Sequence, residues 1–320
     1  MFESIATRRI LVQEVGPRDG FQIEDRFVPT AEKIDLIDAL SLCGLAKIEV
    51  TSFTSPKAIP ALADADEVMR GIRRTPGVVY TALVPNLRGA ERALAAGTDE
   101  LNLVMSASET HNLLNLRMTR EQSAARLLEV VDLAKGAGVA LNLSLSTAFG
   151  CPMEGEVPAG EVLDLAGRFL GHGVAGITLC DTTGMAHPVQ VKALCEAFRA
   201  RFPEAELTVH LHNTRGMGLA NALAAAEAGV ERFDASLGGL GGCPYAPGAT
   251  GNVCTEDLIH MFQAMGAPVD VDLPRLLAAA RSLPELVGHD VPGQVLHAGR
   301  SRDLHPAPDT LAEIRARALA

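Results

Sequence analysis

Short runs rich in apolar and β-branched residues alternate regularly along the chain with longer helix-like segments. The short runs are typical of buried strands, bounded by turn-forming residues. Strands that are separated by helices favour βαβ units and a parallel sheet. We predict eight strands, at residues 10–15, 47–52, 78–84, 100–106, 139–146, 176–181, 207–212 and 232–237.

The helix-like segments have plausible starts and stops. Thr30 precedes one of them, Thr119 precedes another, and a third ends at Gly229; hydroxyl residues favour helix N-termini and glycine favours C-termini. Each is long enough to cross back over a sheet. Eight such units in about 250 residues match the α/β class and a (β/α)8 TIM barrel, which closes the sheet and leaves no strand edge exposed. A doubly wound open sheet is the alternative.

The chain shows no Pro/Gly/Ser-rich linker that would divide it, so we predict a single domain over residues 1–320. The barrel occupies about 8–266, and a short C-terminal helical or irregular appendage occupies about 267–320, with helical character after Thr255. From roughly Asp290 the sequence is rich in Pro, Gly and His and has little periodicity. We expect that stretch to pack as an irregular tail.

Composition excludes several classes of partner. The 39 acidic side chains outnumber the 28 basic ones, for a formal net charge of −11, which argues against nucleic acid and against an anionic membrane surface. No segment reaches the roughly 18 apolar residues of a membrane span, and Glu3 with two arginines occupies the place of a signal-peptide core. The six cysteines form no C-x-x-C pair and are read as free thiols. We expect a cytoplasmic protein that acts on a small molecule.

Polar residues gather at the predicted strand ends, which in such a barrel form the catalytic rim. They are Arg18, Asp19, Glu49, Asp181, His210 and His212. Side chains two apart in a strand point to one face, so the pair His210 and His212 suits a divalent cation. Oxygen ligands from Asp19 and the Asn252 amide would complete a set that suits Mg²⁺ or Mn²⁺. Two histidines that merely hydrogen-bond are, on this pattern alone, an equally good interpretation.

Two carboxylates and one thiol have competing interpretations. Glu49, between Ile48 and Val50, faces the barrel interior if those neighbours face the helices, where it either serves the site or simply pairs with Arg18. Asp181 either serves the site or caps the turn that follows it. The glycine-rich segment 238–252 carries Cys243 and resembles a lid, from which a thiol can exchange a proton; the alternative is a flexible turn with an incidental cysteine.

Six segments together resemble the 3-hydroxy-3-methylglutaryl-CoA lyase family, a group within the metal-dependent TIM-barrel lyases and synthases. They are GPRDG, IEVTSFTSPKAIPALADADEV, FGCPMEG, CDTTGMAHP, HLHNTRGMGLANALAA and GLGGCPYAPGATGN, which span about residues 10–265. The resemblance implies a divalent metal, Mg²⁺ or Mn²⁺, held by Asp19, His210, His212 and Asn252. It also implies active-site roles for Arg18, Glu49, Asp181 and Cys243, substrate contacts for Arg18, Ser52 and Asn115, an acyl-CoA substrate and a homodimer.

The implied reaction is the retro-Claisen cleavage of 3-hydroxy-3-methylglutaryl-CoA, or a close analogue, to acetyl-CoA and a keto acid, acetoacetate in the first case. Asp19 or His210 would take the hydroxyl proton, and the sequence does not choose between them. Arg18 would stabilise the enolate oxygen. Cys243 would protonate the enolate carbon, and Glu49 and Asp181 would orient ligands or relay protons.

The chain departs from the family pattern where positive charge is expected. Phe21, Ile23 and Asp25 occupy the places of Leu, Asn and Lys, and Asn142 occupies the place of an arginine on the fifth strand. Asp25 in place of the lysine and Asn142 in place of the arginine are both expected to remove positive charge near the substrate, unless Arg26 substitutes for the lysine. The reaction type is therefore better supported than the acyl group. A synthase or aldolase acting on a 2-oxo acid, and a non-catalytic barrel that binds a metal or ligand, are the alternatives.

Overall fold

The computed structural model describes residues 3–242 and 251–320. Eight parallel strands close into a barrel in the order of the sequence, with β1 paired to both β2 and β8. The predicted TIM barrel is therefore confirmed, and the open sheet is excluded because β1 and β8 are hydrogen-bonded neighbours. The strands are β1 (Leu11–Glu14), β2 (Lys47–Ser52), β3 (Val79–Val84), β4 (Glu100–Ser106), β5 (Ala140–Ser146), β6 (Gly176–Asp181), β7 (Glu206–Leu211) and β8 (Arg232–Ala235).

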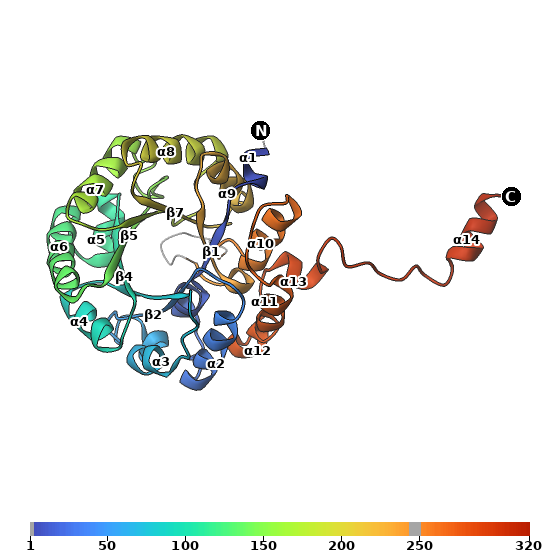
Figure 1. Cartoon of the computed structure of the whole chain (residues 1–320), viewed down its shortest axis with the longest axis horizontal. Helices are drawn as coiled ribbons and strands as arrows, with labels where there is room; N and C mark the ends of the chain where they lie inside the picture. The colour runs from blue at the N-terminus through green and yellow to red at the C-terminus, as the bar shows by residue number, and fades with distance from the viewer. Residues whose placement is uncertain (1–2, 243–250) are drawn as a thin grey trace.

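Helices form a ring around the barrel (Figure 1). They are α2 (Thr30–Ser41), α3 (Ala65–Gly71), α4 (Leu87–Ala95), α5 (Glu109–Leu116), α6 (Arg120–Ala137), α7 (Ala159–Gly171), α8 (Pro188–Arg201), α9 (Gly218–Glu227) and α10 (Thr255–Ala264). Thr119 caps α6 as predicted, in a reciprocal capping box with Gln122. Thr30 instead lies inside α2, after Pro29, and its hydroxyl donates to Asp64.

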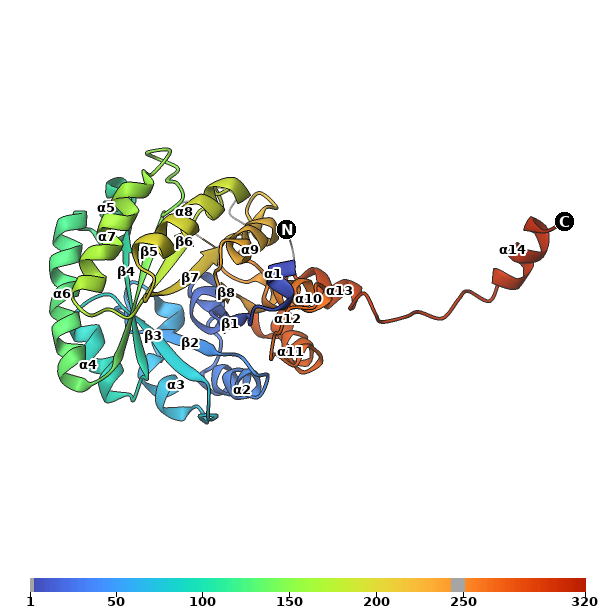
Figure 2. The same ribbon diagram turned by 45° about the horizontal axis from the view of Figure 1, so that its top comes forward.

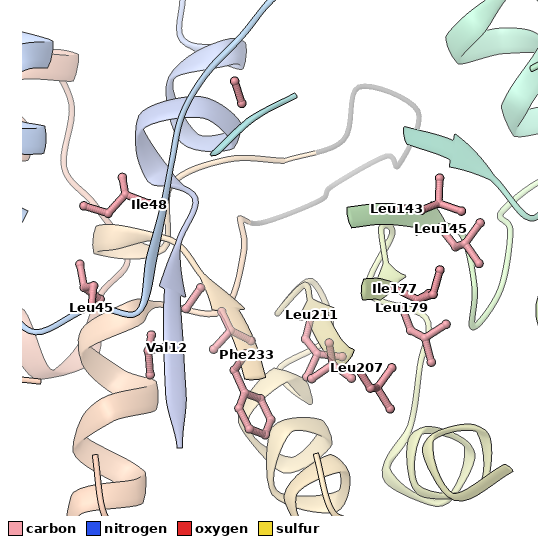
Figure 3. Packing of buried hydrophobic residues seen from close by; sticks show 14 of the residues in the cluster. Val12, Leu45, Ile48, Leu143, Leu145, Ile177, Leu179, Leu207, Leu211 and Phe233 are labelled. Carbon is pink, nitrogen blue, oxygen red and sulfur yellow. The ribbon is translucent and has the colours of Figure 1, made fainter. Parts of the chain in front are cut away.

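The two faces of the sheet differ in chemistry. Alternate residues that face the helices are apolar and fully buried, and Figure 3 shows several of them, including Ile48, Leu143, Ile177 and Phe233. The barrel interior below the rim is polar instead of aliphatic, with Lys47 Nζ donating to Glu100 Oε1 at 2.5 Å. Because these interior groups bond to one another, the charges and amides avoid the penalty of unpaired burial.

The short turns and the N-terminal helix complete the barrel. They are α1 (Glu3–Ala6), η1 (Gly16–Gly20), η2 (Phe21–Ile23), η3 (Pro60–Leu62) and η4 (Leu237–Gly239). In η1, a single turn of π-helix, a Cβ at Gly16 would lie 2.7 Å from Glu14 Oε1, which the Gly16 and Leu237 backbone N–H groups hold in place. A register shift in β2 between Glu49 and Thr51 is a bulge next to the strand end, a place where bulges re-aim side chains.

The C-terminal segment is more helical than predicted. After α10 come α11 (Leu273–Ala280), α12 (Leu283–Val287), α13 (Gln294–Ala298) and α14 (Leu311–Ala318). The expectation of a packed irregular tail from Asp290 holds only for the first part of this stretch, where Val291 and Val295 are buried and the Gln294 and Val295 backbone N–H groups donate to Asp257. Residues 304–320 are exposed, and α14 lies away from the barrel (Figures 1 and 2). Its sequence, LAEIRARA, is rich in strong helix formers, although propensity alone stabilises an isolated helix of this length only marginally in water. That the chain is one domain stays a prediction.

Candidate active site

A cavity of about 580 Å³ lies at the C-terminal ends of the strands. Its lining includes five of the residues predicted from the sequence: Arg18, Asn115, Asp19, His210 and His212. These residues come from the turn after β1, from α5, and from β7 and the residue after it. The closed barrel therefore brings together groups that are up to 194 positions apart in the chain, counted from Arg18 to His212. This is the rim at which such barrels carry their catalytic groups.

Asp19, His210 and His212 form a compact group of metal-ligand type. One ligand atom from each residue lies within 4.8 Å of the others, and all three side chains are buried. The two histidine Nε2 atoms are 3.2 Å apart, close to the roughly 3 Å between adjacent ligands of an octahedral ion with bonds of about 2.1 Å. His210 and His212 therefore point to the same side of the strand, as their spacing predicts.

Asn252 reaches this group through the segment that follows the eighth strand. It forms an isolated bridge with His212, and the backbone N–H of Val253 donates to the carbonyl of Leu211 at 2.9 Å. The Asn252 amide nitrogen donates to Asp19 Oδ2 at 2.8 Å and to the Leu240 carbonyl at 2.9 Å. Its buried Oδ1 has no hydrogen-bond partner in the described part of the chain.

This donor set fits a divalent cation. A buried amide oxygen without a partner is costly unless something binds it. Burial and the nearby charge of His210 lower the pKa of His212 to about 3, so that imidazole is neutral and has a free lone pair. Burial alone would raise the pKa of Asp19, but Arg18 and both histidines outweigh it and lower that pKa to about 2. Two imidazoles, a carboxylate and an amide oxygen are ligands for Mg²⁺, Mn²⁺ and similar ions.

Asp234 on β8 is a site residue that our sequence reasoning missed. Its Oδ2 lies 3.3 Å from His210 Nδ1, the nitrogen opposite the one that faces Asp19. A carboxylate at that position fixes the ring orientation and tautomer of a metal-binding histidine. Burial lowers the pKa of His210, but Asp234 and Asp19 outweigh burial, and the net pKa is raised. Strand alternation along β8, which turns Asp234 to the face opposite the buried Phe233, was the signal available in the sequence.

Arg18 and Glu49 form a buried ion pair beside the metal-ligand group. Arg18 Nε donates to Glu49 Oε2 at 2.5 Å, and a second guanidinium nitrogen donates to Asp19. Burial lowers the pKa of Arg18, but Asp19 and Glu49 outweigh it and raise that pKa, so the guanidinium stays charged. Asn102 on β4 donates to the other oxygen of Glu49 at 2.7 Å. Glu49 therefore orients Arg18, and Asn102 in turn orients Glu49.

Asp181 and Ser52 lie near the cavity but do not line it. Oδ1 of Asp181 accepts hydrogen bonds from the backbone N–H groups of Met185 and Ala186 at 2.8 and 3.1 Å, so this carboxylate holds the loop after β6. Burial raises the pKa of Asp181 to about 6. The hydroxyl of Ser52 lies 2.7 Å from that of Thr54, which does line the cavity.

Cys243 lies outside the described residues. Another thiol, that of Cys180 on β6, lines the cavity, and the strand register pairs Cys180 with His210. Side chains alternate along a strand, so Cys180 faces inward where its neighbour Asp181 does not. Strand alternation applied to β6 would have indicated this residue from the sequence.

The structure shows where the residues that depart from the family pattern lie. Asn142 is buried in the polar interior, where its amide donates to Asn102 and Thr178, each at 2.9 Å, and it does not line the cavity. The Asn142 side chain thus contacts the buried polar layer that bonds Glu49 through Asn102, and the loss of positive charge expected at this position stays a prediction. Arg26 does not substitute for a lysine in the cavity, because its guanidinium donates to the Glu285 carbonyl at 2.8 Å. Asp25 is exposed.

Comparison with known proteins agrees with this geometry. The HMGL-like family model matches residues 9–283. A hydroxymethylglutaryl-CoA lyase from Bacillus subtilis is 45% identical over 294 residues, covering 92% of this chain and 98% of its own. An (R)-citramalyl-CoA lyase from Chloroflexus aurantiacus is 39% identical over 300 residues, covering 91% and 95%.

A solved structure extends the likeness to three dimensions. An HMG-CoA lyase from Acinetobacter baumannii, in complex with coenzyme A and 3-methylmalate, is 54% identical and superposes with a TM-score of 0.91 over 94% of this chain and 98% of its own. Among the described residues, no helix has the length and apolar character needed to cross a membrane. With a barrel, a buried donor set and full-length relatives that all agree, the chain belongs to the HMGL-like family.

Proposed function

We propose that this chain is a metal-dependent carbon–carbon lyase that cleaves a 3-hydroxyacyl-CoA, 3-hydroxy-3-methylglutaryl-CoA or a close analogue, to acetyl-CoA and a keto acid. The observation that carries the proposal is the convergence of Asp19, His210, His212 and Asn252 beside the buried Arg18 at one cavity. Burying a charged guanidinium, a carboxylate and two imidazoles together is costly, and such clusters are typical of functional sites. This favours a catalytic barrel over a non-catalytic one.

The cleavage needs a proton acceptor, a bond-breaking step and support for an enolate. When bound, a divalent cation supplies Lewis-acid polarisation of the carbinol hydroxyl and an acyl oxygen. Asp19 or His210, which both line the cavity, takes the hydroxyl proton. Arg18 faces the same cavity with a permanent positive charge, and this charge stabilises the thioester enolate oxygen as the carbon–carbon bond breaks.

The remaining predicted residues complete the proposal. Cys243 donates a proton to the enolate carbon to give acetyl-CoA. Glu49 acts through Arg18, which it holds at 2.5 Å, and Asp181 acts through the loop whose backbone it binds. Asn115 contacts the substrate from α5, and Ser52 acts through the hydroxyl of Thr54.

A citramalyl-CoA is the second candidate substrate. The relative named (R)-citramalyl-CoA lyase is 39% identical over nearly the same residues, and the 54% identical relative is in complex with 3-methylmalate. Both acids have a shorter carbon chain than 3-hydroxy-3-methylglutarate and carry a carboxylate directly on the carbinol carbon. The keto acid distinguishes the two reactions, because citramalyl-CoA yields pyruvate and the glutaryl substrate yields acetoacetate.

A direct test uses protein stripped with EDTA and restored with Mg²⁺ or Mn²⁺. Acetyl-CoA release is measured on both CoA esters, and the keto acid is identified by mass spectrometry. The proposal expects cleavage that EDTA abolishes and either ion restores, with His212→Ala inactive at metal concentrations that saturate the wild type. If the wild type cleaves neither CoA ester, the proposed function is contradicted.

Location and assembly complete the proposal. We place the enzyme in the cytoplasm, because Glu3 and two arginines stand where a signal peptide would carry its apolar core. We also expect a homodimer, in keeping with the resemblance to the lyase family. Light scattering coupled to size-exclusion chromatography measures the mass in solution, and a mass of 33.7 kDa, that of one chain, would contradict the dimer.

A further inference from the structure

Arg117 has a backbone conformation that its side chain does not favour. It ends helix α5 with φ 57° and ψ 30°, in the left-handed region. Among non-glycine residues of the described chain, only Arg117 and Thr147 have a positive φ. Glycine adopts this conformation at helix C-termini without the steric penalty of a Cβ, and asparagine at a smaller one. The sequence therefore keeps an arginine where the backbone itself favours a smaller residue.

The surrounding chain holds this turn in place without help from the Arg117 side chain. Its backbone N–H donates to the Leu113 carbonyl at 3.0 Å. The buried amide of Asn112 donates to the Met118 carbonyl and to the Ser123 hydroxyl, both at 2.8 Å. Thr119 then caps α6. Strained residues persist where neighbouring contacts fix them, and they gather at functional sites.

The same turn sets the Arg117 side chain at the edge of the catalytic cavity. His111, Leu114 and Asn115 line the cavity from one face of α5, and Arg117 lines it from the end of that helix. Arg117 is exposed, and within the described chain no carboxylate or hydrogen-bond acceptor engages its guanidinium. The other arginine of the lining, Arg18, is buried and held by Asp19 and Glu49.

We infer that Arg117 binds a phosphate group of the CoA portion of the substrate. The inference rests on the proposed function, in which the reacting acyl end binds beside Arg18 and the metal-ligand residues, in the buried part of the cavity. The phosphates lie at the far end of the long pantetheine arm and stay near solvent, where Arg117 lies. A guanidinium binds phosphate oxygens through two N–H groups at once. A chain with a net charge of −11 also needs local positive charge to hold a polyanion.

The test compares two thioesters that share one acyl group. The acyl-CoA carries the phosphates, and the acyl-pantetheine lacks them. Arg117→Ala and Arg117→Gly are expected to raise KM for the acyl-CoA by about tenfold, the value of one charge-assisted contact, and to leave kcat and the KM for the acyl-pantetheine unchanged. Arg117→Lys is expected to restore part of the loss. Arg126→Ala is the matched control, because Arg126 is an exposed arginine on α6 that does not line the cavity.

Two further measurements separate binding from folding and from catalysis. Arg117→Gly is expected to raise the thermal unfolding midpoint, since it relieves the left-handed strain, whereas an arginine with a structural role would lower it. Calorimetric titration with free CoA and with pantetheine measures the same contact without turnover. Equal KM increases for both thioesters, or unchanged CoA affinity in Arg117→Gly, would overturn the inference. If the wild type cleaves neither CoA ester, the proposed function fails, and the CoA titration still decides the role of Arg117.

Discussion

Replacing Asp234 by Asn tests whether His210 is a metal ligand. The Asp234 and His210 side chains are 10% and 9% exposed, and their atoms lie 3.3 Å apart. A hydrogen bond to a charged group contributes about 1.5–3 kcal/mol, and at this long separation we take the lower end. The asparagine keeps the volume and an acceptor oxygen but loses the charge. About 1.5 kcal/mol corresponds to roughly a tenfold weaker metal affinity.

The assay is calorimetric titration of Mn²⁺ into EDTA-stripped protein. We expect Asp234→Asn to raise the dissociation constant about tenfold. Asp234→Ala is expected to raise it by about 10- to 100-fold, the range typical when a residue that hydrogen-bonds to a metal ligand is lost. Ser236→Ala is the matched control, because that buried hydroxyl lies two residues further on and has no partner in the described chain. A dissociation constant for Asp234→Asn within twofold of wild type would refute the reasoning.

Three further predictions address the ligand set, the thiol and a buried carboxyl. Asn252→Ala removes the unpartnered Oδ1 and the hydrogen bond to Asp19, and we expect Mn²⁺ affinity to fall at least about tenfold, as a ligand and an orienting contact are both lost; unchanged affinity would exclude Asn252 as a ligand. Cys243→Ala is expected to lower kcat by about 100-fold or more, the usual contribution of a positioned general acid, with metal affinity unchanged; near-normal turnover would contradict that role. Burial raises the pKa of Glu14 to about 8. Between about pH 4.5 and 8 the folded chain therefore keeps a proton that the unfolded chain releases. In this range Glu14 makes the free energy of unfolding fall as pH rises, by up to about 1.4 kcal/mol per pH unit. Glu14→Gln keeps an acceptor oxygen for the Gly16 and Leu237 N–H groups, and its amide nitrogen can donate to the Thr255 hydroxyl in place of accepting from it. The substitution removes the pH slope, so in urea unfolding the stability of the variant should rise relative to that of the wild type as pH rises; parallel pH curves would show that Glu14 is not protonated in the folded state.

Strand alternation explains which site residues could be predicted. His210 lies on β7 and His212 directly follows its last residue, and the period of two in extended chain places both imidazoles on the same side. The same rule, not applied to β6 and β8, would have indicated Cys180 and Asp234. It also separates Cys180, which lines the cavity, from Asp181, whose carboxylate binds the loop backbone.

Contacts between distant segments could not be predicted in this way. Asn252 was predicted from the family resemblance and not from strand alternation, because it joins the site through the chain after η4, which runs back beside the end of β7. Asn142 occupies the place of an arginine in the family pattern, and only the closed barrel shows that its amide bonds to Asn102 in the polar interior. The strained turn at Arg117 likewise depends on a contact from Asn112 to the following loop.

The sequence by itself determined the eight βα units, the strand ends that carry the chemistry and the shared face of the two histidines. These follow from local periodicity and from turn and cap residues, which act over a few positions. Only the tertiary structure decided the neighbours of each buried charge: Asp234 behind His210, Asn102 behind Glu49 and Asn252 against Asp19. Barrel closure and strand register fix these pairs, because they set which distant side chains share one level of the interior.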